Sequence, residues 1–415
     1  MWNKMNITKS PVKKASERMT KMQLVIVSIV VCISSGLAQD TLQVSTYQFG
    51  IYNQYDLRNT SQNAIATHRL IYDLQRSKLT PKMSGKLGAV TTEVLSFATT
   101  YLSMLWSHEF GHSLRAQQVG GEFRIHNVAF PIPYTTMHLP DSISLVDEAL
   151  SVTAGFEVNH LNVRSIQREF ILNNGASNED LNFAFANRIM YPLYASVIVP
   201  IDPEDPEVWI NTAGDPVHTT LPVFKNYSDN KVILEDGSVN PDLVAYYSQA
   251  AMLSSLFSLL DPQFYQVLGA SFGQKGKARK PTYIIGDHEN GWTYGTLFNV
   301  SPLGYELYMN NYIHLDGHKF SLYFKHGRPF KNNGVGLVWN EFISNNKLVV
   351  SASVEAWDQD LFGQGVSGET DVRYMVSQDL GLVINAGYKT EGYVLGKQVP
   401  AGLNFGLGLV YFNRE

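Results

Sequence analysis

The last part of the chain, residues 277–415, alternates between apolar residues and small or polar residues with a period of two. Leu403, Phe405 and Leu407, for example, are each followed by a small or polar neighbour. This period places the two sets of side chains on opposite faces of a strand. We count about eight such segments, joined by Gly, Asn and Asp turns: Trp292–Asn299, Leu303–Ile313, Lys319–His326, Gly334–Phe342, Leu348–Ala356, Val372–Val376, Leu382–Tyr388 and Leu403–Tyr411. Consecutive strands of this kind predict an antiparallel meander, and eight can close a small barrel.

The two faces of these strands differ in character. One face is apolar and aromatic, and the other is small and polar, which is how outer-membrane strands present themselves to lipid and to the lumen. A soluble sandwich or barrel with an ordinary core would have similar strands. The Tyr-rich strands and the export signal described below favour the membrane interpretation.

The chain before this β part has helical periodicity. Apolar residues recur at helical spacing in several segments that end at Gly, Asn or Pro. We predict helices over the following ranges: Lys86–Gly120, Ser144–Asn173, Asn178–Val199 and Asp242–Leu268. The Pro-rich segment Ile201–Asn240 predicts a long irregular excursion or lid. The fold class is therefore α+β, with a helical domain at 39–272 followed by a β-meander or barrel domain at 277–415.

Residues 1–38 have the pattern of an export signal. Lys13, Lys14 and Arg18 precede an apolar run, and Gly36-Leu37-Ala38 offers a small-x-small cleavage site. The one cysteine, Cys32, lies inside this signal. A mature chain would have no cysteine, so a metal site would use His and carboxylate ligands. The net charge of −5 does not favour a nucleic-acid partner.

Ser107-His108-Glu109-Phe110-Gly111-His112 contains an HExxH pattern within the first predicted helix. His108 and His112 are four residues apart, so both imidazoles project from one face and can reach one Zn²⁺. Glu109 is placed to deprotonate a zinc-activated water. We expect Phe110 to point into the core and Gly111 to keep the helix surface open near the metal. The alternative is a pair of surface histidines on an ordinary helix.

The third zinc ligand is the least specified part of the site. Glu157 lies in an Ala- and Gly-containing helix that can approach the motif helix closely, and a carboxylate in an apolar setting is costly unless it is paired or bound to metal. We predict Glu157 as the ligand, with Asp261 and His160 as alternatives. Glu157 could instead pair with Arg164 or Arg168.

The motif region resembles that of the site-2 protease family of intramembrane zinc peptidases. The resemblance rests on His108-Glu109-Phe110-Gly111-His112 with Ala116 and Gly120, and on Ala154-Gly155-Phe156-Glu157-Val158-Asn159, and it covers residues 105 to 160. It implies His108 and His112 as ligands and Glu109 as base. The family's later Asp ligand in a Leu-Asp-Gly motif has its nearest candidate in Leu260-Asp261-Pro262, which lacks the Gly. The helices here are also more polar than that family's membrane core.

Two further elements of a peptidase site are left open by the sequence. Several residues could stabilise a tetrahedral oxyanion: His126, Tyr134, His138, Asn159 and His160. The segment 123–132 could form an edge strand to which an extended peptide adds.

Taken together, these features predict an exported zinc-dependent endopeptidase that acts on peptide or protein substrates in the periplasm or outer membrane of a Gram-negative bacterium. Two alternatives are an outer-membrane β-barrel, transport or binding component with a structural, non-catalytic metal, and a secreted soluble binding protein.

Overall fold

The computed structural model describes residues 45–413 except 54, 80–84, 130–131, 199–209, 211–213, 229–230 and 273–278. The predicted export signal, residues 1–38, lies outside the described residues. Within them the chain has seven α-helices, a ten-stranded antiparallel sheet and a two-stranded hairpin. The predicted α+β class is therefore confirmed.

The large sheet is a meander that does not close into a barrel. Its strand order is β1-β12-β11-β10-β9-β8-β7-β6-β5-β4, so β1 and the two-residue β4 form its two edges. Eight long consecutive strands, β5 to β12, make up the predicted meander. The bounds are β1 Ser45–Tyr52, β4 Ile285–Gly286, β5 Gly291–Ser301, β6 Gly304–Leu315, β7 His318–Pro329, β8 Asn332–Ser344, β9 Leu348–Gln359, β10 Gly363–Met375, β11 Leu380–Lys389 and β12 Gly402–Asn413. β1 comes from the segment assigned to the helical domain, and it pairs with β12.

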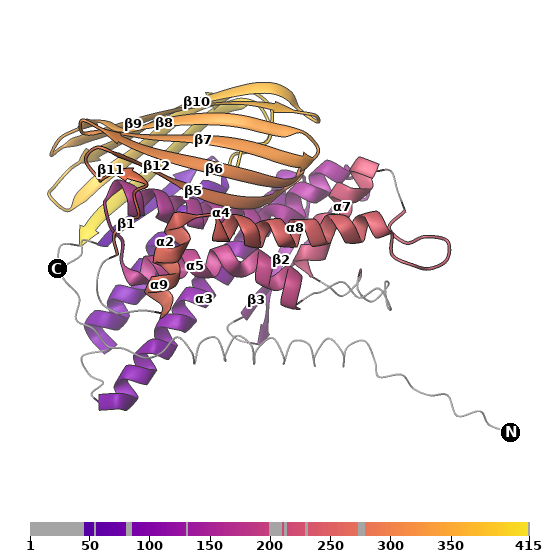
Figure 1. The fold of residues 1–415 in the computed structure, drawn as a ribbon, viewed down its shortest axis with the longest axis horizontal. Coiled ribbons are helices and arrows are strands. Elements are labelled where there is room, and N and C mark those ends of the chain that lie inside the picture. Colours follow the sequence, from indigo (N-terminus) through magenta and orange to yellow (C-terminus); the bar gives the residue numbers. More distant parts are fainter. Residues whose placement is uncertain are drawn as a thin grey trace.

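The sheet curves over the helices, which lie on its concave side (Figure 1). The helices are α2 Leu57–Leu74, α3 Gly85–Gln118, α4 Leu145–Leu172, α5 Asn178–Leu193, α7 Asp215–Ser228, α8 Pro241–Leu259 and α9 Pro262–Phe272. Two short π-helical turns, η1 Gln75–Leu79 and η3 Tyr194–Ile198, extend α2 and α5. The hairpin consists of β2 Glu122–Ala129 and β3 Ile132–His138.

The helix boundaries follow local capping chemistry. The hydroxyl of Ser144 accepts from the Asp147 N–H at the start of α4, and Ser177 caps α5 in the same way through Asp180. Pro262 separates α8 from α9 by a bend of 79°. The predicted helices over Lys86–Gly120, Ser144–Asn173, Asn178–Val199 and Asp242–Leu268 match α3, α4, α5 with η3, and the bent pair α8–α9.

The prediction of an irregular excursion over Ile201–Asn240 is wrong for its central part, which is helix α7. Asp215-Pro216 begins that helix, and proline is favoured in a first turn because it needs no N–H partner there. Val217, Leu221 and Phe224 then recur at helical spacing and are buried.

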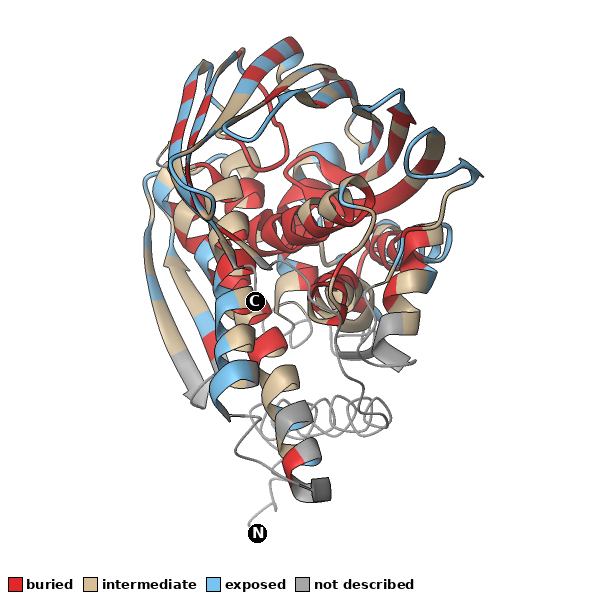
Figure 2. Cartoon of the chain, turned by 90° about the vertical axis from the view of Figure 1, so that its left-hand side faces the viewer, coloured by how far each residue is buried: buried red, intermediate tan, exposed pale blue. Residues whose placement is uncertain are grey.

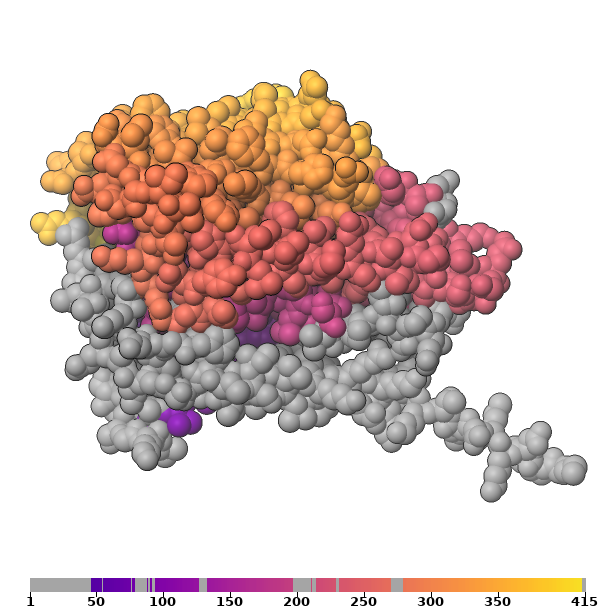
Figure 3. Space-filling model, viewed as in Figure 1, coloured from indigo at the N-terminus to yellow at the C-terminus, as the bar shows by residue number. Residues whose placement is uncertain are grey.

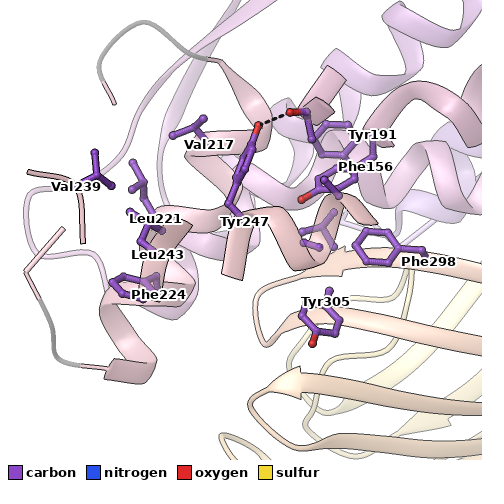
Figure 4. Packing of buried hydrophobic residues seen from close by; sticks show 14 residues of the cluster. Phe156, Tyr191, Val217, Leu221, Phe224, Val239, Leu243, Tyr247, Phe298 and Tyr305 are labelled. Atoms are coloured by element: carbon purple, nitrogen blue, oxygen red, sulfur yellow. Dashed lines mark hydrogen bonds between the residues drawn. The ribbon is translucent and has the colours of Figure 1, made fainter. Parts of the chain in front are cut away.

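One hydrophobic cluster joins α7 to the rest of the molecule. Phe156 of α4, Val217 and Leu221 of α7, and Leu243 and Tyr247 of α8 all belong to it, as Figure 4 shows. Tyr247 also donates a hydrogen bond to the carbonyl of Ala195 at 3.3 Å (Figure 4). This cluster fixes α7 beside α4, and therefore fixes the position of the first residue of α7.

Burial alternates along the strands, and the helix beneath them is buried along most of its length (Figure 2). α4 contacts the inner face of β5 and carries buried residues from Ala149 to Ile171. It is the central helix of the structure.

No single helix among the described residues is both long enough and apolar enough to cross a membrane. The bent pair Pro241–Leu259 and Pro262–Gly269 passes that test only when its two halves are taken together.

Candidate metal centre

The HExxH motif lies in the second half of α3, where it is covered by α4. His108 and His112 are buried, with 1% and 3% of their surface exposed. Their Nε2 atoms are 3.2 Å apart. The expectation that the two imidazoles converge on one point is therefore confirmed.

The second nitrogen of each imidazole is held by α4. His108 Nδ1 lies 2.7 Å from Asn159 Oδ1, and His112 Nδ1 lies 3.0 Å from the carbonyl of Ser151. The Ser151 carbonyl can only accept. The Asn159 side-chain oxygen is also an acceptor, because the amide nitrogen of the same side chain donates to Asn187 Oδ1 at 2.8 Å. Each imidazole therefore donates from Nδ1 and turns its Nε2 toward the other histidine, where a metal could bind both Nε2 atoms.

Asp215, the first residue of α7, completes a group of three ligands. Its Oδ2 lies 2.8 Å from His108 Nε2 and 3.7 Å from His112 Nε2. A tetrahedral zinc with bonds of about 2.0–2.1 Å separates its ligand atoms by roughly 3.3 Å. The three observed separations lie around that value, so the residues present fit a zinc ion. The Asp215 side chain is 31% exposed, so the group is open to solvent on that side.

Two glycines let α3 and α4 approach closely enough to build this group. A Cβ on Gly155 would lie 2.3 Å from His108 Nε2, and a Cβ on Gly111 would lie 2.6 Å from the Ala154 carbonyl oxygen. Gly111 therefore allows α3 and α4 to pack closely. The expectation that it keeps the helix surface open near the metal is wrong. Phe110 does not point into the core either, since 47% of its surface is exposed.

The Asp215 carboxylate favours positive charge on the neighbouring histidines. Burial lowers the pKa of His112, but the neighbouring Asp215 carboxylate outweighs burial and raises that pKa to about 9. Desolvation raises the pKa of Asp215, and the two histidines outweigh it and hold that pKa well below its usual value.

Glu109 adds a second carboxylate beside the group. It is 8% exposed, and its charge contributes to raising the pKa of both His112 and Tyr194. Among the ion pairs of the described residues, neither Glu109 nor Asp215 has a lysine or arginine partner. A divalent cation would balance these two carboxylates.

The structure does not bring Glu157 to the histidines. Both Glu157 and Arg115 are fully buried, and Arg115 Nη2 donates to Glu157 Oε1 at 2.9 Å. The Gly396 N–H donates to the same oxygen at 2.7 Å. Successive α-helical residues are rotated by about 100°, so Glu157 is turned roughly 200° from Gly155, which faces His108. The prediction of Glu157 as the third ligand is therefore wrong, and its cationic partner is Arg115 instead of Arg164 or Arg168.

The two alternative ligands also lie elsewhere. Asp261 forms an ion pair with Arg188 and accepts from Gln167 Nε2 at 2.7 Å. His160 is buried against Phe298, and burial lowers its pKa to about 3. Neither belongs to the group that includes the histidine pair.

The structure also shows the contacts of two residues that the sequence offered for stabilising an oxyanion. Asn159 is committed to His108, while His126 stacks on Tyr134 in the hairpin at 5.0 Å between ring centroids. The hydroxyl that the structure does place near Asp215 belongs to Tyr194: a Cβ on Gly214 would meet its oxygen at 2.4 Å. The sequence offered no local signal for Tyr194, because η3 and α7 are separated along the chain.

The hairpin β2–β3 lies beside the motif helix. β3 packs on α3, and the Thr135 hydroxyl donates to the Glu109 carbonyl at 3.3 Å. The segment predicted as an edge strand, 123–132, is the first strand of this hairpin and reaches the start of the second.

No family model, no curated protein and no solved structure matches this chain.

Proposed function

We propose that the chain is a zinc-dependent endopeptidase whose metal is held by His108, His112 and Asp215. The observation that carries the proposal is the convergence of two Nε2 lone pairs and one carboxylate oxygen, 2.8 to 3.7 Å apart. The resemblance to the site-2 protease family implies only His108, His112 and Glu109, because Gly214-Asp215-Pro216 does not match the family's Leu-Asp-Gly motif. Three protein ligands leave a fourth tetrahedral position for water, which is typical of catalytic zinc sites.

Each neighbouring residue has a distinct role. Zinc, when bound, would supply Lewis-acid chemistry that brings the pKa of a water to about 7. Glu109 would take the proton of that water and return it to the leaving amine. Asn159 and Ser151 would keep both imidazoles in the tautomer that leaves Nε2 free.

A peptide substrate is supported by the hairpin next to the motif. An extended peptide can add to a strand edge through main-chain hydrogen bonds. β3 lies against α3 at the level of Glu109, so such a peptide would run past the catalytic base. This placement favours a peptidase over other zinc hydrolases.

The alternative is a structural metal without turnover, in a transport or binding protein. The full burial of both histidines favours it, because structural sites are closed. The exposed side of Asp215 and the second carboxylate, Glu109, argue for catalysis.

The test is zinc content and proteolysis, measured in parallel on purified full chain. We expect one zinc per chain in the wild type, in Glu109→Gln and in Glu157→Gln, and its loss in Asp215→Ala. Asp236→Ala, in an exposed turn, is the matched control. Cleavage of an unfolded protein substrate should fall roughly 10²- to 10⁴-fold in Glu109→Gln.

Two outcomes would overturn parts of the proposal. Zinc retained in Asp215→Ala would refute the ligand set. Zinc bound in the wild type, with no cleavage that depends on Glu109, would favour the structural metal.

A further inference from the structure

The large sheet has an unusual polarity: its inner face carries buried charged and polar side chains beside a few apolar ones, and its outer face is apolar. Buried ion pairs occupy the inner face, including Glu306 with Lys325 at 3.3 Å and Glu355 with Lys397 at 2.9 Å. An ordinary soluble sheet packed on helices would have the reverse arrangement. The sheet therefore faces something apolar on its outer side.

The outer face is continuous over eight neighbouring strands, from β1 to β6 in the order of the sheet, and carries large side chains. On β12, Leu403, Phe405, Leu407, Leu409 and Tyr411 are 48–76% exposed, and register aligns them with the outer residues of β11. The other large exposed residues on this face are Phe49, Ile51, Met309, Leu315, Phe324, Val335, Leu337, Trp339, Ile343, Val354, Val366, Tyr374, Leu380, Leu382, Ile384 and Tyr388. A typical monomer exposes only a few hundred Å² of contiguous apolar surface, so this face marks an interaction surface.

Charged residues on the outer side lie at the strand ends and turns. Asp358 and Lys331 form an ion pair at one end, and the turn at Asp316 lies at the other. The strands β5 to β12 have 10 to 13 residues, which is long enough for the roughly 9 to 11 residues that a transmembrane strand needs. The tyrosines Tyr374, Tyr388 and Tyr411 lie toward the ends, where aromatic side chains meet the membrane–water interface.

An open sheet in hydrocarbon needs partners for its edges, and helices supply them here. At the β1 edge, Asn63 of α2 accepts from the Gly50 N–H at 2.9 Å and donates to the Gly50 carbonyl at 3.0 Å. Arg69, also on α2, donates to the Thr46 carbonyl at 2.9 Å.

On the opposite side β4 covers only Gly291 and Trp292 of β5, and farther along β5 the helical region again bonds the backbone. Asp261, between α8 and α9, accepts from the Thr296 N–H of β5 at 3.2 Å. Arg188 of α5 donates to the Thr296 carbonyl. Side chains on helices thus satisfy backbone groups that a closed barrel would pair with another strand.

The apolar outer surface continues from the sheet onto the edge helices. α8 contacts β5 and lies directly below the sheet in the space-filling view of Figure 3. Met252, Leu256 and Leu259 on α8 are 43–61% exposed, and α8 with α9 forms the bent pair that is apolar enough to lie in a membrane. Leu70 and Leu74 of α2 extend the same surface at the other edge.

We propose that this outer surface contacts the hydrocarbon of a lipid bilayer, with the sheet as a half-barrel wall that α2 and the α8–α9 pair complete. Between its rims the surface is uncharged, its strands are long enough to cross a bilayer, and helices bond backbone groups at both of its sides. A surface that binds another protein would not need to combine these three properties.

Single-cysteine variants test this inference independently of zinc. In a Cys32→Ser background, Leu337→Cys and Leu407→Cys place an environment-sensitive nitrobenzoxadiazole label at mid-face. Asn346→Cys in a turn and Glu235→Cys, whose native side chain is 89% exposed, are the controls. The full chain is reconstituted in dimyristoylphosphatidylcholine vesicles, and dithionite reduction of the label is followed.

We expect the chain to float with the vesicles, and the labels at 337 and 407 to be reduced on the order of tenfold more slowly than those at 346 and 235. Equal rates at all four positions, or a chain that does not float, would overturn the inference. Protection at 337 and 407 without lipid, in a chain that sediments as a dimer, would assign the face to a second copy instead. Zinc content measured on the same samples shows whether the metal centre fails separately.

Discussion

The inner face of the sheet and the metal centre both bury charged groups, but they neutralise them differently. On the sheet side, three buried or nearly buried glutamates each have a cationic partner within 3.3 Å: Glu306 with Lys325, Glu355 with Lys397, and Glu369 with Arg58. At the metal centre, Glu109 and Asp215 face two histidines and no such partner among the described ion pairs. The first arrangement is complete within the chain, whereas the second calls for a cation from outside.

Removing a cation from a completed pair should have the largest effect. In Arg115→Leu the Glu157 carboxylate loses its partner at 2.9 Å while both side chains are fully buried. We expect the free energy of unfolding to fall by about 3–5 kcal/mol in urea titrations. The double variant Arg115→Leu with Glu157→Leu should recover much of that loss, and zinc per folded chain should stay unchanged. A loss well below 1 kcal/mol would show that the pair is not what holds α3 to α4.

The incomplete arrangement should show itself in pH dependence after zinc is removed with a chelator. The pKa of His112 is raised to about 9, above its unfolded value of about 6.5. The resulting stability is fully present below pH 6.5 and is lost as the pH rises through 9, by on the order of 3 kcal/mol. Urea unfolding between pH 6 and 9.5 measures it, and Asp215→Asn should remove most of the slope.

Zinc should invert this trend, because ligand protons must leave before the metal binds. Zinc affinity should therefore rise over the pH range in which the metal-free chain loses stability. A pH-independent affinity would contradict the participation of His112.

The close contact between α3 and α4 at the metal centre, which the sheet lacks at Gly368, should give a smaller effect. In Gly155→Ala the new Cβ would lie 2.3 Å from His108 Nε2. We expect a destabilisation of about 1–3 kcal/mol and a lower zinc occupancy, measured by thermal unfolding and elemental analysis. Gly368→Ala in the sheet is the control, since the nearest atom to its new Cβ is 3.9 Å away. Equal effects at both positions would contradict the close approach of α3 and α4.

The smallest predicted effect concerns the orientation of one imidazole. Asn159→Ala removes the acceptor of His108 Nδ1 at 2.7 Å. Zinc affinity, measured by chelator competition, should fall 10- to 100-fold, as is common when a partner of a ligand histidine is removed. Asn162→Ala is the matched control, because Asn162 also donates to Asn187 but does not contact a histidine ring nitrogen in the described hydrogen bonds. Equal losses in the two variants would reduce the role of Asn159 to packing.

The sequence predicted the elements better than their three-dimensional relations. Period-two alternation found the eight long strands, and helical spacing found α3 and α4. The same alternation cannot tell whether a meander closes on itself. Here it stays open, and residues of the helical region bond backbone groups at its two sides: Asn63, Arg69, Asp261 and Arg188.

The metal centre was predictable only in part. The histidine pair follows from i, i+4 geometry alone. Asp215 was hidden because its Pro-rich surroundings resemble a loop, although Asp-Pro followed by Val217 and Leu221 is a helix-start signal. Glu157 was favoured because a carboxylate in an apolar helix needs a partner. The structure shows that Gly155 faces His108, so Glu157, two residues later on the helix, is turned away from the histidines.

The pairing of β1 with β12 has a consequence for how the chain is assembled. The Asn53 side chain accepts from the Phe405 N–H, a contact between residues 352 positions apart. During synthesis β1 and the side chains of α2 that cover it must wait, unpaired, until β12 has been made. Loops this long slow the search for the native pairing and leave a strand edge exposed to other chains meanwhile. We therefore expect chaperones to keep β1 from pairing with other chains until β12 has been synthesised.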